Sequence, residues 1–157
     1  MQAKKIKFLL KREIEMIEKV IERNYGAKID LSRVAVAKTS VDKLWLLSKQ
    51  IKSFDLLKLK INVLGLYFGR LKLEKIRLSI EGCQLVGKYA RRNFVILSKD
   101  EAEGFAKGYD VGVEKAVDCE EGNFVLVKCG NNLLGTGKFY KNRVKNLTPR
   151  SRRITPF

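Results

Sequence analysis

The sequence contains no histidine and no pair of cysteines spaced as Cys-x-x-Cys. Its three cysteines, Cys83, Cys119 and Cys129, are an odd number, which argues against a disulfide framework. Zinc sites are built mainly from cysteine and histidine, so a zinc site is not expected either. We therefore expect no metal and no cofactor.

Long apolar runs are also missing. No uninterrupted stretch approaches the length of a membrane span, and no hydrophobic region precedes a small-residue cleavage site. The sequence therefore predicts a cytoplasmic protein without membrane contact.

Acidic residues are absent from residues 122–157, which carry eight lysines and arginines. The preceding residues 91–121 carry five basic and eight acidic residues, and the whole chain has a formal net charge of +16. A surplus of this size points to a polyanionic partner, above all nucleic acid. A lysine-rich soluble surface, or the charged surface of a thermophile, is the alternative.

Nothing in the sequence arranges a catalytic site. The carboxylates show no paired arrangement, although a lone lysine or cysteine nucleophile stays open as an alternative. Gly130 and Gly135 have the spacing of a phosphate-binding loop, but Thr136 stands in place of the lysine and the stretch opens no helix. We expect no catalytic residue.

The first part of the chain is expected to place helices on a small mixed sheet. A helix over 4–24 is predicted from apolar spacing, with Gly26 after its end. Thr39 to Asp42 resembles a capping box that opens a second helix to about Phe54. The remaining expected elements are strands over 34–37, 59–71 and 76–80 and a short helix over 81–90.

The second part reads as a small mixed barrel. A strand over 94–97 precedes a full capping box at Ser98 and Glu101, which starts a helix ending near Phe105. Further strands are expected over 124–127, 133–140 and 143–147, joined by turns at 130–132 and 140–142. Gly135 and Gly137 inside a strand indicate a bulge or a close backbone approach. We place the boundary at Tyr89–Arg92, giving domains 1–90 and 91–157.

Aromatic residues gather in the first part. Tyr67 and Phe68 lie between Gly65 and Gly69, and Trp45 lies in the expected second helix. We interpret all three as core or domain-interface residues in preference to platforms for bases.

Several short motifs in the second part resemble a PUA domain, an RNA-binding pseudo-barrel. They are Asn93 to Leu97, Glu101 to Val111, Phe124 to Val127, Leu134 to Lys138 and Val144 to Leu147. Upstream, Val63 to Leu71 and Arg77 to Ile80 resemble the archaeal-type two-domain PUA proteins of large-subunit ribosome biogenesis. The resemblance implies an α/β domain followed by a PUA-like β pseudo-barrel. It also implies a non-catalytic protein that binds pre-rRNA, with an exosome or assembly-factor partner at the N-terminal domain.

A second family is similar at the C-terminus. Leu134 to Lys138 and Val144 to Arg153 resemble the PUA-like module of sun/fmu-class rRNA cytosine-5 methyltransferases. The chain lacks that enzyme's glycine-rich cofactor loop and its Pro-Cys motif. This likeness implies a stand-alone RNA-binding module that assists an rRNA or tRNA methyltransferase or another RNA-modification enzyme.

The candidate RNA-binding residues are mostly the basic residues of the C-terminus. Strand-edge protection explains one or two of them, but seven without a carboxylate favour phosphate contact. Asn142 and Asn146 are equally compatible with hydrogen bonds to RNA and with turns. In PUA families the loop of Lys107 and Tyr109 lies near bound RNA, and Tyr109 is able to stack on a base. The full set is Lys107, Tyr109, Lys138, Lys141, Arg143, Lys145, Arg150, Arg152 and Arg153.

Overall fold

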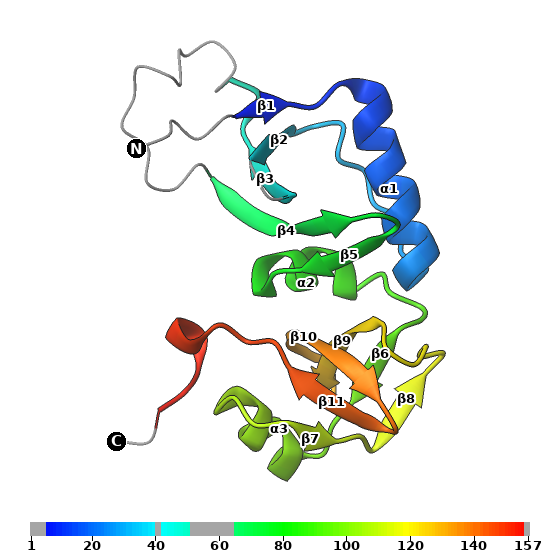
Figure 1. Cartoon of the computed structure of the whole chain (residues 1–157), viewed down its shortest axis with the longest axis vertical. Coiled ribbons are helices and arrows are strands. Elements are labelled where there is room, and N and C mark those ends of the chain that lie inside the picture. Colours follow the sequence, from blue (N-terminus) through cyan, green and yellow to red (C-terminus); the bar gives the residue numbers. More distant parts are fainter. Residues whose placement is uncertain (1–5, 40–41, 51–64, 156–157) are drawn as a thin grey trace.

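The computed structural model describes residues 6–39, 42–50 and 65–155. The described strands form two sheets, one from each part of the chain, with the helix α2 (Ile80–Gly87) between them (Figure 1). The expected α/β fold with a C-terminal β pseudo-barrel is confirmed by this arrangement.

The first sheet has five strands in the order β1-β2-β3-β4-β5. Every described pairing in this sheet is antiparallel, whereas a mixed sheet was expected in the first part of the chain. Among the described strands, a parallel pair occurs only in the second sheet. The strands are β1 (Lys7–Phe8), β2 (Ala35–Thr39), β3 (Lys43–Leu47), β4 (Leu66–Lys72) and β5 (Lys75–Leu78).

The helix α1 (Lys11–Tyr25) covers one face of this sheet. The prediction of a helix from Lys4 was wrong at its start, because Lys7 and Phe8 pair with β2 and Leu10 takes the extended N-cap conformation. Its end is confirmed: Gly26 has a φ of 64°, and its N–H bonds to the Glu22 carbonyl.

The predicted helix beginning at the Thr39 capping box was wrong. Thr39 ends β2, Asp42 has a φ of 59°, and Lys43–Leu47 returns as a strand in a hairpin. Leu44 packs into the main core, whereas Leu47 packs with Ala35 in a small cluster on the other face of the sheet. Because both faces are apolar, the alternation of a strand is hidden and the spacing imitates a helix. Ile51 and Phe54 lie outside the described residues, as do 59–64 of the predicted strand over 59–71.

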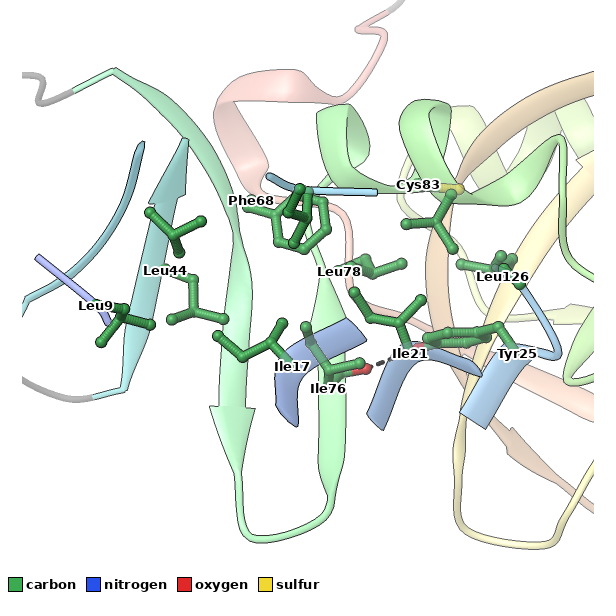
Figure 2. Packing of buried hydrophobic residues seen from close by; sticks show 14 residues of the cluster. Leu9, Ile17, Ile21, Tyr25, Leu44, Phe68, Ile76, Leu78, Cys83 and Leu126 are labelled. Carbon is green, nitrogen blue, oxygen red and sulfur yellow. Dashed lines mark hydrogen bonds between the residues drawn. The ribbon is translucent and has the colours of Figure 1, made fainter. Parts of the chain in front are cut away.

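The main core lies between α1 and the first sheet and continues into the second part of the chain. Figure 2 shows Ile17, Ile21 and Tyr25 of α1 facing strand residues such as Ile76, whose carbonyl accepts a 2.7 Å hydrogen bond from the Tyr25 hydroxyl. Leu126 of the second part belongs to the same buried cluster.

The helix α2 links the two parts. Ser79 caps it by accepting a hydrogen bond from the Gly82 N–H. Two hydrogen bonds join α2 to β10. The Cys83 thiol donates to the Gly135 carbonyl at 3.2 Å, and the Gln84 amide donates to the Leu133 carbonyl at 2.7 Å. A Cβ at Gly87 would collide with the Leu133 side chain, which would have to shift, so glycine suits this close approach.

The second sheet has six strands in the order β7-β11-β10-β9-β6-β8, and its one parallel pair among the described strands is β6 with β9. The predicted capping box of α3 (Lys99–Ala106) is confirmed at Ser98 and Glu101. The strands are β6 (Phe94–Ile96), β7 (Val111–Gly112), β8 (Lys115–Val117), β9 (Phe124–Cys129), β10 (Asn132–Tyr140) and β11 (Arg143–Asn146).

Both predicted turns and the glycine irregularity of the last strands are confirmed. The β9–β10 turn contains Gly130 at φ 57°, and the register shifts between Leu133 and Gly135. A Cβ at Gly137 would collide with Val144 of β11, which explains glycine at that position.

No described strand is shared between the two sheets, and the chain passes from one to the other between Leu78 and Phe94. The division into 1–90 and 91–157 stays a prediction, because the main core crosses it.

Candidate nucleic-acid interface

The hairpin of β10 and β11 presents a row of cations to solvent. Lys138 pairs across the strands with Lys145, and Tyr140 pairs with Arg143. Val144 and Phe139 fill the intervening positions and are buried, so the alternation of the strands sends the polar residues outward. We call Lys138, Lys141, Arg143 and Lys145 the hairpin cations.

The turn of this hairpin is fixed by its backbone. Lys141 and Asn142 have φ values of 45° and 60°, which suits a tight two-residue turn. The Glu121 carboxylate accepts hydrogen bonds from the Lys141 N–H at 3.0 and 3.2 Å. A carboxylate therefore does approach the basic hairpin, but it binds the backbone, and no hairpin cation forms an ion pair within the described part of the chain.

Lys107 and Tyr109, the predicted RNA-binding residues of the loop, differ in whether the protein already engages their side chains. Lys107 forms an ion pair with Glu103 at 3.2 Å, which partly neutralises it. Tyr109 is 65% exposed, so its ring is open to a partner.

Asn146 is structural. Its amide donates to the carbonyls of Phe105 and Tyr109 at 2.7 and 3.0 Å, and its side-chain oxygen accepts from the Thr148 N–H at 2.8 Å. It is buried, and these bonds fix the β11 end against the Tyr109 loop.

The three C-terminal arginines have separate environments. Arg153 donates from Nε to the Thr148 carbonyl at 3.1 Å, and its side chain packs against Gly108. Arg152 forms an ion pair of 2.5 Å with Glu81 at the start of α2. Partial burial opposes ionisation of Glu81, but the Arg152 hydrogen bond, a backbone hydrogen bond and the Arg152 charge together outweigh it and lower the pKa of the carboxyl. Arg150 is exposed.

The structure therefore does not bring all nine predicted residues into one patch. Arg152 and Arg153 hold the C-terminal segment in place, and the Ile154 N–H adds a bond to the Ala106 carbonyl at 2.9 Å. The hairpin cations lie together on β10, β11 and the turn that joins them.

A cavity of about 400 Å³ lies between the two sheets, away from the predicted set except at Arg152. Its first wall consists of Lys43, Trp45, Tyr67, Arg70 and Arg77. The sequence favoured a core or domain-interface role for Trp45 and Tyr67, and it did not single out Lys43, Arg70 or Arg77 as site residues. Because Lys43 and Trp45 were expected to be helical, their cross-strand pairing with Arg70 and Tyr67 was not anticipated.

The described residues contain no group of three or more potential metal ligands and no helix long and apolar enough to cross a membrane.

Comparison with known proteins assigns the second part of the chain. Residues 92–154 match the family model described as the Methyltransferase RsmF PUA domain. The chain is 31% identical over 109 residues to the ribosomal RNA small subunit methyltransferase F of Aeromonas hydrophila subsp. hydrophila. This match takes in 69% of the chain but only 22% of the relative, so the chain spans about a fifth of that enzyme's length.

The fold as a whole resembles a crystallised PUA domain from Aeropyrum pernix K1, determined as a tartrate complex. The superposition has a TM-score of 0.54, covers 94% of this chain and 87% of the other, and has 14% sequence identity. Residues 92–154 therefore match a PUA-domain model, and the chain as a whole shares the fold of a crystallised PUA-domain protein.

Proposed function

We propose that this chain is a non-catalytic RNA-binding protein that acts on ribosomal RNA or its precursor. The observation that carries the proposal is the row of hairpin cations, held outward on a β scaffold without an ion-pair partner in the described structure. Like charges at this spacing repel one another unless an anion lies among them, and RNA phosphates supply such an anion. The PUA domain supports RNA as the polyanion.

Two settings are compatible with this chemistry. The first is pre-rRNA processing in large-subunit biogenesis, with a protein partner at the N-terminal domain. The second is assistance to an rRNA or tRNA methyltransferase or another RNA-modification enzyme, and the likeness to methyltransferase F supports it. That match is longer than the part of the chain after residue 91, so it reaches into the first part as well.

The site is tested by replacing three hairpin cations, Lys141→Ala, Arg143→Ala and Lys145→Ala, in one variant. We expect a loss of rRNA affinity on the order of tenfold or more, because three phosphate contacts disappear. The measurement is filter binding of a labelled pool of rRNA fragments at one fixed salt concentration.

The matched control replaces Lys11, Arg12 and Lys19, three exposed cations of α1, with alanine. Circular dichroism checks folding, since removal of exposed charge costs about half a kcal/mol or less. An equal loss in both variants would show that the whole basic surface holds the RNA. Sequencing the retained fragments separates the settings: large-subunit fragments support the first, and small-subunit fragments support the second.

A further inference from the structure

One wall of the cavity between the sheets carries cationic side chains on paired strands. Lys43 pairs with Arg70, and Arg70 pairs with Arg77, so three cations stand in a row across β3, β4 and β5. Like charges directly opposite one another destabilise a sheet. Among the residues that line the cavity the one carboxylate is Glu81, and it is engaged by Arg152. The row therefore pairs with no carboxylate of the cavity wall and suits a bound anion.

The same wall carries an aromatic pair. Trp45 and Tyr67 are cross-strand partners whose ring centroids lie 5.2 Å apart at an interplanar angle of 51°. The Trp45 N–H already donates to the Thr39 hydroxyl at 3.1 Å, so its polar atom is satisfied within the protein. Both rings are half-buried and line the cavity, which leaves ring surface there for a flat ligand.

A β-bulge brings the two features together. Leu44 pairs with Gly69 and Trp45 with Tyr67, so Phe68 is an extra residue in β4. Phe68 is fully buried in the main core, while Tyr67 and Arg70 both line the cavity. Without the extra residue, two positions three apart on a strand would face opposite sides.

The opposite wall offers hydrogen-bonding groups. Thr136 of β10 is 5% exposed and Thr148 is 7% exposed, and both line the cavity. Neither hydroxyl oxygen has a partner within the described residues. A buried hydroxyl without a partner is unfavourable, so these two groups suit a ligand that donates and accepts hydrogen bonds.

We propose that this cavity binds one unpaired nucleotide of an RNA strand. The base stacks on Trp45 and Tyr67, its phosphate lies at the cation row, and Thr136 and Thr148 bond to the base edge. Stacking on aromatics with recognition of a splayed-out base is a common mode of single-stranded RNA binding. The cavity volume of about 400 Å³ is within the range of small-ligand sites. The inference rests on the proposed function, since it takes RNA as the ligand.

Trp45 is the single tryptophan of the chain, so intrinsic fluorescence reports on this cavity. The probes are a short single-stranded RNA of mixed sequence, the same sequence as a blunt duplex, and free uridine and adenosine monophosphates. Total binding is followed in parallel by the anisotropy of end-labelled RNA. We expect the single strand to quench Trp45 and to bind more tightly than the duplex.

Two variants locate the effect. Tyr67→Ala should weaken single-strand binding by at least about fivefold, the lower end of base–aromatic stacking. Tyr67→Leu is the second variant if the alanine form fails to fold. The double variant Lys43→Ala, Arg70→Ala is compared with Lys72→Ala, Lys75→Ala, which removes an equal cross-strand pair of charges outside the cavity. The cavity pair should lose at least about fivefold more affinity than the outer pair.

The outcomes separate the two claims. RNA binding without a change in Trp45 fluorescence, together with equal effects of the two charge pairs, overturns the cavity proposal and leaves the proposed function standing. No RNA binding by anisotropy overturns both. If a free monophosphate quenches Trp45 at the same concentration as the RNA does, the proposal that the ligand is part of an RNA strand is overturned. The cavity is then assigned to a free nucleotide.

Discussion

Cys83 lies where α2 meets β10, and its side chain is fully buried. Burial raises the pKa of the Cys83 thiol to about 12, and burial likewise raises the pKa of the Tyr25 hydroxyl. In both groups the folded protein holds its proton more tightly than the unfolded chain does. Their contribution to stability is therefore complete below the unfolded pKa and is lost as the pH rises through the folded pKa.

We predict that the free energy of unfolding falls as the pH rises from about 9 to about 12, by up to about 1.4 kcal/mol per pH unit for each such proton. Urea unfolding at several pH values measures this slope. Cys83→Ala should make the slope shallower. Val86→Ala, which shortens another buried side chain of α2, should lower stability at every pH and leave the slope as it is. Identical slopes in the two variants would contradict the assignment to Cys83.

The sequence predicted which basic residues gather at the C-terminus, but it did not show which of them have a structural role and which are free to bind RNA. The eight lysines and arginines after residue 121 identified a basic C-terminus, and four of them do stand free on the hairpin. The roles of Arg152 and Arg153 depend on Glu81 and Gly108, which are distant in sequence. Only the folded chain brings such partners together, so no local pattern separates a structural arginine from one free to bind RNA.

At the scale of elements, local signals succeeded where turns and caps decide the structure. The Ser98 capping box and the Gly130 turn each depend on a few adjacent residues. The prediction of a helix was wrong at β3 because this strand is apolar on both faces. An apolar residue on each face suits its place between β2 and β4, which the sequence alone does not show. The error also hid the pairing of Lys43 with Arg70 and of Trp45 with Tyr67, so the cavity could not be predicted.

The helix α2 covers apolar residues of the second part, including Leu133, and we predict that it is needed for full stability there. A fragment of residues 90–157 should fold but melt at a lower temperature than a fragment of residues 79–157, which keeps the Ser79 cap and α2. Thermal circular dichroism measures both. Equal melting temperatures would indicate that residues 91–157 form an independent domain.

At the scale of the whole molecule, charge is spread unevenly. The net charge is +16, yet the lysines of α1 alternate with glutamates whereas the hairpin cations have no acidic neighbours in sequence. Glutamate and lysine one turn apart on a helix pair with each other, which lowers the field that RNA meets there. The charge of α1 is therefore largely compensated, whereas that of the hairpin cations is not.

We predict that RNA affinity falls steeply with salt, with a log–log slope of about −0.7 for each phosphate contact on a single strand. Titrations at several potassium chloride concentrations give the slope for the whole chain. The hairpin variant described above should reduce its magnitude. A slope near zero for the unmodified chain would remove the electrostatic basis of binding.

The position of α2 also has a consequence for the order in which the chain becomes compact during synthesis. Its buried face, which includes Cys83 and Gly87, packs on β10, and β10 begins only at Asn132 and is synthesised after α2. The parallel partner of β6 is β9, which is also made later. The first sheet is therefore synthesised while one side of its core still lacks a cover, and the nascent chain keeps that apolar face exposed until β9 and β10 form their hairpin.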